Sequence, residues 1–354
     1  AGMTRDRVAQ TASAVRVFRS LNQAKSKSVL LSDTPFYASG TYPGGTAFKG
    51  GVLLPDGRIF CVPANSTTAR IYNPASNTTT TPSGTYPGSN AFAGGVLLQD
   101  GRVFCVPFNA TSARIYDPVT DTLITPGGTY PGAATFAGGC LLPDGRVFCC
   151  PAASTTARIY DPVSDTVTTP PGNYPTSLQG TVLLQDGRAF CVPQNAVTAR
   201  IYDPRTNTTT TPSGTYPGSN AFVGGVLLLD GRVFCVPFAS STARIYDPVT
   251  DTLITPSGAY PGGSAFIGGV LLPDGRVFCI PYGSTTARIY DPIADTVITP
   301  PGSYFGGSAF HGGVSTLDGR VFCVPRDATG AILFGQFSSG FPKNVALSAY
   351  LNKF

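Results

Sequence analysis

Seven copies of one sequence pattern, each centred on Asp-Gly-Arg, run through this chain of 354 residues. The triplets follow one another at intervals of 44 residues, with a single interval of 42. They begin at Asp56, Asp100, Asp144, Asp186, Asp230, Asp274 and Asp318. A fixed period of this length indicates an array of similar supersecondary units, each packed against its neighbours. The repeat therefore constrains the fold more than any other feature.

Each copy contains four runs that are typical of strands, as the second copy shows. Residues 94–98 are apolar, Asp100-Gly101 is a strong hairpin signal, and residues 103–106 return antiparallel. Residues 113–116 form the third run, and residues 122–125, rich in β-branched side chains, form the fourth. Asp and Pro between these last two runs favour a turn.

The first two runs of each copy are apolar at consecutive positions, which is typical of strands buried on both faces. Blades that stack side by side around an axis bury their inner strands in this way. The sequence therefore predicts an all-β fold, a seven-bladed β-propeller of four-stranded antiparallel blades. A linear solenoid is less favoured, because no repeat has the polar outer face of a cap.

The seventh repeat ends without an obvious fourth strand. Residues 28–40 resemble the fourth strand and linker of the other blades, so we expect them to supply the outer strand of the last blade and to remove a free edge. The rival donor is the segment 345–350. This organisation divides the chain into a basic arm (1–27), a propeller (28–337) and a C-terminal tail (338–354).

Residues 77–92 recur without change at residues 207–222, an offset of 130 residues. The offset equals the length of three repeats, which indicates that blades four to six arose by duplication of blades one to three.

The frame of the repeat resembles a known family. Leu-Leu-Pro-Asp-Gly-Arg-Val at residues 141–147 and Arg-Ile-Tyr-Asp-Pro at residues 158–162 are similar to the kelch-type repeat of the galactose-oxidase-like variety. Two features depart from that pattern: Val-Pro replaces the glycine doublet after the second strand, and the chain has no tryptophan. In style, the chain also resembles the kelch-like propellers of structural and attachment proteins of phages and large DNA viruses.

The residues offer little for catalysis. His311 is the only histidine, so the histidine pair that a galactose-oxidase copper site takes is missing. The sequence contains no metal-ligand spacing, no Gly-x-Ser-x-Gly elbow and no phosphate loop. We therefore expect a non-enzymatic protein without catalytic residues, metal or cofactor. His311 replaces small or apolar residues of other blades, so it could still face the central axis.

Seven of the nine cysteines occupy one equivalent position in the seven second strands. Cysteines spread over different blades make a poor disulfide framework, so we expect them to be buried and reduced. Cys140 is an exception. If Asp144-Gly145 forms a two-residue turn, Cys140 lies opposite Cys149, and a cross-strand disulfide becomes conceivable.

Residues 1–27 hold six basic residues against one acidic residue, and their apolar residues recur at helical spacing. The expected amphipathic helix either caps the propeller or anchors it to an acidic or apolar partner. The residues that we expect to form the anchor are Arg5, Arg7, Arg16, Phe18, Arg19 and Leu21. No membrane-spanning segment and no specific nucleic-acid site is expected.

In a propeller, the linkers between blades and the loops between strands two and three lie on one face. The residues of these segments that suit a ligand are aromatic or carry amides: Tyr86, Asn90, Phe108, Asn109, Asn195, Tyr216, Asn220, Phe238 and Tyr282. Such side chains suit a neutral glycan or a partner protein. The alternative for the tyrosines before Pro-Gly is packing between blades.

Low charge, similar blades and reduced cysteines favour a structural or attachment protein of a virion, assembled in the host cytoplasm. Its partners would be other structural proteins, through the arm or the tail, and a host-surface glycan. The alternative is a secreted or cell-surface lectin or a kelch-type carbohydrate oxidase.

Overall fold

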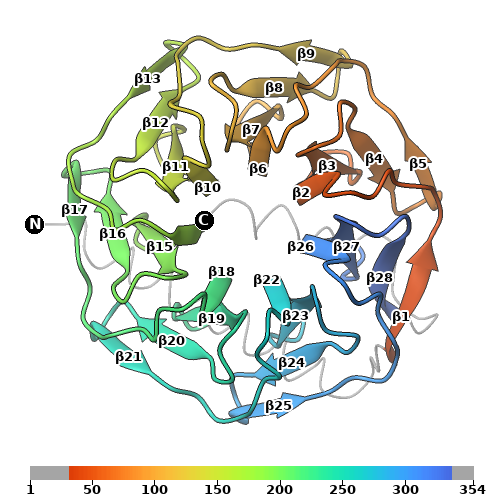
Figure 1. Ribbon diagram of the computed structural model, residues 1–354, viewed down its shortest axis with the longest axis vertical. Helices are drawn as coiled ribbons and strands as arrows, with labels where there is room; N and C mark the ends of the chain where they lie inside the picture. The colour runs from red at the N-terminus through yellow and green to blue at the C-terminus, as the bar shows by residue number, and fades with distance from the viewer. Residues whose placement is uncertain (1–31, 337–354) are drawn as a thin grey trace, which may run out of the picture.

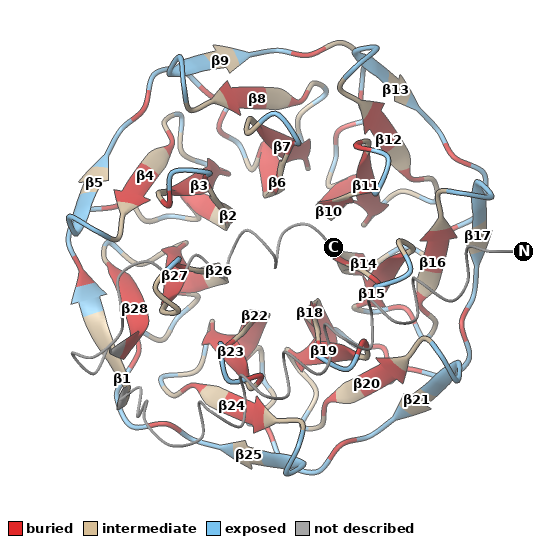
Figure 2. Cartoon of the chain, turned by 180° about the vertical axis from the view of Figure 1, so that it is seen from behind, coloured by how far each residue is buried: buried red, intermediate tan, exposed pale blue. Residues whose placement is uncertain are grey.

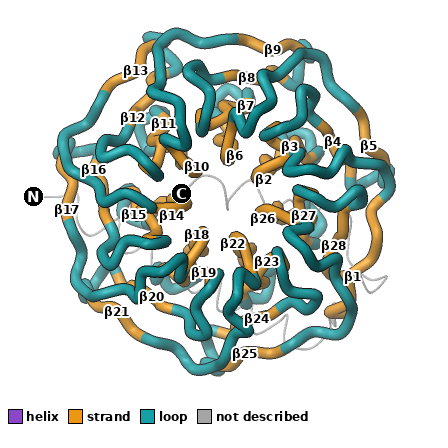
Figure 3. Tube along the Cα trace, viewed as in Figure 1, coloured by secondary structure: helices purple, strands orange, loops and turns teal. Residues whose placement is uncertain are grey.

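The computed structural model describes residues 32–336. These residues form 28 strands and no helix, arranged in seven four-stranded sheets around a central axis (Figure 1). Neighbouring strands are antiparallel in every sheet. The predicted seven-bladed propeller is confirmed, and in the described part of the chain loops join all strands directly (Figure 3).

Each blade contributes one strand to each of four concentric layers. The innermost strands are β2 (Phe48–Leu53), β6 (Phe92–Leu97), β10 (Phe136–Leu141), β14 (Leu178–Leu183), β18 (Phe222–Leu227), β22 (Phe266–Leu271) and β26 (Phe310–Ser315). The second strands are β3 (Ile59–Pro63), β7 (Val103–Pro107), β11 (Val147–Pro151), β15 (Ala189–Pro193), β19 (Val233–Pro237), β23 (Val277–Pro281) and β27 (Val321–Pro325).

The two outer layers are shorter in most blades. The third strands are β4 (Arg70–Asn73), β8 (Arg114–Asp117), β12 (Arg158–Asp161), β16 (Arg200–Asp203), β20 (Arg244–Asp247), β24 (Arg288–Asp291) and β28 (Ala331–Gln336). The outermost strands are β5 (Thr78–Thr80), β9 (Thr122–Ile124), β13 (Thr166–Thr168), β17 (Thr208–Thr210), β21 (Thr252–Ile254), β25 (Thr296–Ile298) and β1 (Ser32–Ala38).

The ring closes through β1, which comes from the other end of the chain. It pairs antiparallel with β28, so the seventh sheet has the order β1-β28-β27-β26. Pro35 lies opposite Phe334, and Phe36 lies opposite Leu333. The segment before the first repeat therefore provides the outermost strand, as its resemblance to a fourth strand indicated. Residues 345–350, the rival donor, lie outside the described residues.

The hydrophobic core lies between blades. Phe60 and Val62 of blade one form one buried cluster with Phe92 and Tyr116 of blade two. The rings of Phe60 and Tyr116 stack with centroids 4.9 Å apart, and an equivalent stacked pair recurs at every blade junction. Burial is greatest in the second strands, in which every residue is buried, and least in the outermost strands, which are largely exposed (Figure 2). Each blade is thus stabilised mainly by its two neighbours.

A bulge interrupts every innermost strand at the same place. In blade one the pairing register with β3 shifts between Phe48 and Gly51, so Lys49 and Gly50 share one opposing residue. Gly50 has a φ of 79°, a conformation that side chains disfavour. Bulges bend a strand and redirect its side chains.

The glycines at the second position of these bulges form a ring around the axis. A β-carbon added to any of them would lie 2.9–3.6 Å from the Cα atom of its counterpart in the next blade. The members of this glycine ring are Gly50, Gly94, Gly138, Gly180, Gly224, Gly268 and Gly312. Seven innermost strands can therefore meet only where no side chain stands between them.

The glycine ring yields a test of stability. We expect Gly224→Ala to lower the free energy of unfolding by about 1–3 kcal/mol more than Gly263→Ala. Both residues have positive φ, so both substitutions carry a strain of roughly 1–2 kcal/mol. Only at Gly224 would the new methyl meet backbone, 3.0 Å from Gly268 Cα, because Gly263 faces open space. Urea denaturation measures the difference, and equal losses would contradict the close packing at the axis.

The hairpin turns differ from the expected two-residue form. The Leu142 N–H donates to the Arg146 carbonyl over 2.8 Å, so the turn spans three residues and ends on Gly145, with a φ of 89°. Cys140 consequently lies opposite Phe148 rather than Cys149. A slip of one residue sends a side chain to the other face of a sheet. The predicted juxtaposition is therefore wrong, and the two thiols belong to different interblade clusters.

All nine cysteines are buried and free of disulfides. Burial raises the pKa of most of these thiols, including that of Cys235 to about 12. We expect no thiol of the native protein to react with a thiol-specific reagent at pH 8, and all nine to react after unfolding in denaturant without reductant. Counting labelled cysteines by mass spectrometry checks this, and a shortfall of two in the unfolded sample would reveal a disulfide.

Candidate functional site

The antiparallel blades give the disc two different faces. The linker face carries the connections from each outermost strand to the next blade and the loops between second and third strands, such as residues 81–91 and 108–113. The hairpin face carries the Asp-Gly-Arg hairpins and the turns between third and fourth strands, such as residues 74–77.

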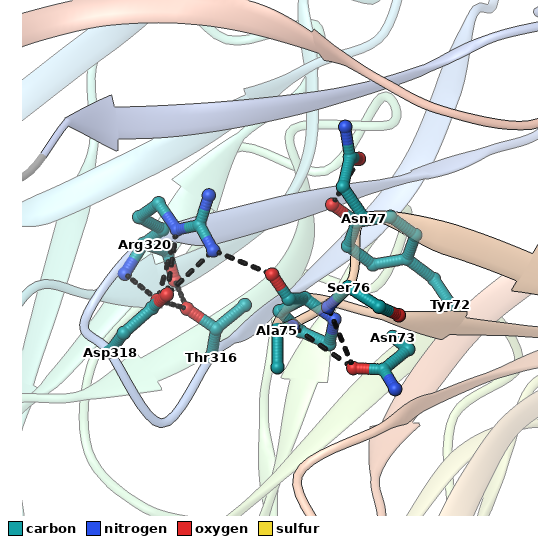
Figure 4. A network of polar contacts seen from close by, with 9 residues as sticks. Tyr72, Asn73, Ala75, Ser76, Asn77, Thr316, Asp318 and Arg320 are labelled. Atoms are coloured by element: carbon teal, nitrogen blue, oxygen red, sulfur yellow. Dashed lines mark hydrogen bonds and ion pairs between the residues drawn. The ribbon is translucent and has the colours of Figure 1, made fainter. Parts of the chain in front are cut away.

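Polar contacts of the hairpin face hold the turns in place. In each hairpin the arginine pairs with the aspartate two residues before it, as Arg58 Nε does with Asp56 Oδ2 at 2.6 Å. At the junction of blades seven and one, Arg320 also donates to the Pro74 carbonyl over 3.2 Å (Figure 4). Asn73 there accepts hydrogen bonds from the backbone of its own turn (Figure 4). These carboxylates and amides are structural.

Two rings of equivalent positions surround the axis on the linker face. The inner ring is the first residue of each bulge: Lys49, Ala93, Ala137, Gln179, Val223, Ile267 and His311. The outer ring is the first residue after each second strand: Ala64, Phe108, Ala152, Gln194, Phe238, Tyr282 and Arg326. The residue type at both positions varies from blade to blade, although the surrounding sequence is closely repeated.

The aromatic, imidazole and cationic side chains of these rings gather in five consecutive blades, from blade five through seven to blade two. The Lys49 ammonium lies 4.4 Å from the centre of the Phe108 ring. The Arg326 guanidinium lies 5.3 Å from the Tyr282 ring, and that ring is 5.7 Å from Phe238. Such geometry is typical of cation–π and aromatic contacts. The result is an arc of half-buried aromatic and cationic groups beside the axis.

Three basic side chains meet at the junction of blades seven and one: Lys49, His311 and Arg326. We call them the axial cluster. Burial and the neighbouring Arg326 lower the pKa of Lys49 to about 8. Burial, followed by Lys49 and Arg326, lowers the pKa of His311 to about 3, so its imidazole is neutral at pH 7. Asp327 pairs with Arg326 at 2.5 Å and accepts a hydrogen bond from the Thr46 N–H.

The predicted aromatic residues divide into two groups. Phe108, Phe238 and Tyr282 lie half-buried in the outer ring, where a ligand can reach them. The prediction is wrong for Tyr86 and Tyr216, which are only 1% exposed. Each packs edge-on against the phenylalanine that opens the next innermost strand, because the Tyr-Pro-Gly linker crosses the blade junction.

The predicted asparagines stabilise the linkers. Asn109 donates to the Ser89 carbonyl and accepts from the Ala134 N–H, which ties together the linkers on either side of blade two. Asn195 accepts from the Asn220 N–H over 2.6 Å in the same way. Asn90 and Asn220 have positive φ, as the tight linker turn requires. Their positions on the linker face are as expected, but their contacts are structural.

Sequence reasoning missed Lys49 and Arg326. Comparison of the seven repeats holds a signal for both, since each replaces a neutral residue of the other blades. His311 was found by that comparison, and it lies in the inner ring. The expected anchor residues of the arm, from Arg5 to Leu21, lie outside the described residues.

Two further findings on the described residues concern metal ligands and membrane-spanning helices. No group of three or more His, Cys, Asp or Glu that could hold a metal ion occurs within residues 32–336. In the same range, no helix is long and apolar enough to cross a membrane.

Comparisons with known proteins show the fold alone. No known protein family and no curated protein matches the chain. A streptogramin B lyase structure is similar with a TM-score of 0.71 at 11% identity, over 86% of this chain and 97% of that chain. A catalytically inactive virginiamycin B lyase from Staphylococcus aureus, with quinupristin, has a TM-score of 0.71 at 11% identity, over 85% of this chain and 99% of that chain.

A fungal alcohol oxidase of the AA5 family, in complex with copper, is similar with a TM-score of 0.64 at 14% identity, over 87% of this chain and 78% of that chain. Propellers host many unrelated functions, so similarity at this level does not carry an activity across. The fold and its linker face define the chain as a seven-bladed β-propeller.

Proposed function

We propose that this chain is a non-enzymatic binding propeller, which holds a glycan with the aromatic arc of Phe108, Phe238 and Tyr282. The observation that carries the proposal is that the blade fold does not require these three aromatic side chains. Blades one and three have Ala64 and Ala152 at the same position, and their strands have the same lengths and register.

The chemistry of the remaining side chains supports binding over catalysis. The thiols are buried, and burial raises the pKa of most of them, which disfavours the nucleophilic thiolate. His311 has too low a pKa to serve as a base near neutral pH. Aromatic faces beside polar groups suit sugars, which present apolar C–H faces and hydroxyl groups.

A triple substitution tests the binding site. We expect Phe108→Ala, Phe238→Ala and Tyr282→Ala together to weaken binding on a glycan array, or to host cells, at least tenfold. The melting temperature should change little, because alanine already occupies this position in two blades. Val119→Ser, Val163→Ser and Val249→Ser form the matched control, since these side chains are about 90% exposed on the hairpin face. Normal binding by the triple variant, or loss of binding in the control, would refute the assignment.

The finer proposal is that the propeller is a structural or attachment protein of a virion, assembled in the host cytoplasm and joined to other structural proteins through the arm or the tail. It is supported by the sequence alone. Low charge, similar blades and reduced cysteines favour a virion protein, and the excess of basic residues in residues 1–27 favours anchoring through the arm. The rival role, a secreted or cell-surface lectin, would use the same face.

Deletion of residues 1–27 separates these roles. We expect the shortened chain to be absent from assembled particles, because it has lost its anchor. Its propeller should still unfold cooperatively. Quantitative mass spectrometry of purified particles and thermal denaturation measure the two effects. Incorporation that survives removal of both the arm and residues 338–354 would exclude anchoring by the ends of the chain.

A further inference from the structure

We propose that the axial cluster binds the anionic group of an acidic glycan, a carboxylate or a sulfate ester, at the junction of blades seven and one. The inference rests on the proposed glycan-binding function and specifies its ligand. It changes the expectation of a neutral sugar that the overall composition favoured.

The geometry brings two cations together without enough negative charge. The Ala47 N–H donates to the Arg326 carbonyl over 2.8 Å, which places Lys49, two residues along β2, beside the start of the Arg326 loop. Within residues 32–336, Lys49 forms no ion pair. Among the described residues, Asp327 is the one that brings a carboxylate to the second-to-third-strand loops at this junction, and both of its oxygens are engaged, by Arg326 and by Thr46.

The electrostatic state of Lys49 shows what the cluster lacks. Burial and Arg326 lower the pKa of its ammonium group to about 8, so the charged form is destabilised in this site. An entering anion would relieve that destabilisation, because an opposite charge within a few ångströms favours the ammonium form. The neutral imidazole of His311 adds an N–H that can donate to an anionic oxygen.

The charges of the whole disc favour the same ligand. Six arginines begin the third strands at the linker face and form no ion pair within the described residues. They are Arg70, Arg114, Arg158, Arg200, Arg244 and Arg288. Among the described residues, Asp327 is the one aspartate in the loops that follow the second strands. Asp121, Asp165, Asp251 and Asp295 accept hydrogen bonds from the linkers at the outer edge of the disc, and the remaining aspartates lie toward the hairpin face. The second-to-third-strand loops and the strands that follow them therefore carry an excess of basic groups, which favours an anionic ligand.

The aromatic neighbours favour a sugar as the carrier of the anion. Phe108 flanks Lys49, and Tyr282 flanks Arg326, so each cation sits beside a ring that can stack on a pyranose. A free inorganic anion would contact only the cations. We therefore expect an acidic oligosaccharide to bind more tightly than inorganic sulfate.

Calorimetric titration of the full chain tests the proposal with four probes: 3′-sialyllactose, lactose, a heparin-derived tetrasaccharide and sodium sulfate. We expect at least one acidic oligosaccharide to bind tenfold or more tightly than both lactose and sulfate. Lys49→Gln should weaken that binding at least tenfold. Arg205→Gln, which removes a 67%-exposed arginine from the hairpin face, should leave it unchanged.

The pH dependence of the affinity tests whether Lys49 is the group that binds the anion. Its ammonium is charged below its pKa, so the affinity of the wild type should fall as the pH rises through about 8 and above. Lys49→Arg should bind with no such fall, because guanidinium stays charged. The other groups that face Lys49 are Arg326, Asp327 and His311, and burial keeps the pKa of His311 near 3, far below this range.

The outcomes separate the two proposals. If lactose binds as tightly as the acidic probes and Lys49→Gln has no effect, the anionic ligand is refuted, while loss of binding in the aromatic triple variant still supports a glycan site. If no acidic probe binds at millimolar concentration, or a DNA oligonucleotide displaces the glycan with higher affinity, the inference is overturned. Retained melting temperature in Lys49→Gln excludes misfolding, and rescue by Lys49→Arg provides a second measure.

Discussion

The close approach of seven glycines at the axis is the contact on which the rest of this propeller depends. Each innermost strand meets the next at Gly94 or an equivalent glycine, where a β-carbon would lie 2.9–3.6 Å from neighbouring backbone. That spacing sets how tightly the blades converge, and it allows the aromatic pairs farther out, such as Phe60 with Tyr116, to stack. The bulge beside each glycine then turns one side chain, such as Lys49, to its place in the inner ring.

The repeat allowed the blade number, the strand order and the layers to be predicted, because period and hydrophobic pattern are local properties. The hairpin register was beyond reach, since Asp144-Gly145 fits both a two-residue turn and the last two positions of a three-residue turn. That difference of one residue moved Cys140 away from Cys149. Tyr86 was misplaced for a related reason: its burial depends on the path of a linker across a junction, which composition does not reveal.

The candidate site was only half predictable. Phe108, Phe238 and Tyr282 stand out as departures within the repeat, and the structure places them on the expected face. The meeting of Lys49 with Arg326 joins blades that are separated by nearly the whole chain, and only closure of the ring brings them together. Net charge also concealed the site, because the aspartates elsewhere in the propeller largely cancel the basic residues around it in the total.

The blades are related by near-sevenfold symmetry, but the residues of the inner and outer rings are not. The duplication that copied three blades left Asn77–Phe92 unchanged in its second copy, yet Lys49 corresponds to Gln179 and Ala152 corresponds to Tyr282. Substitutions at these positions leave the blade pairing intact, so each blade can change its contribution independently. A molecule bound on the axis consequently meets a different pair of inner-ring and outer-ring side chains in each direction. It would therefore bind in one rotational orientation about the axis.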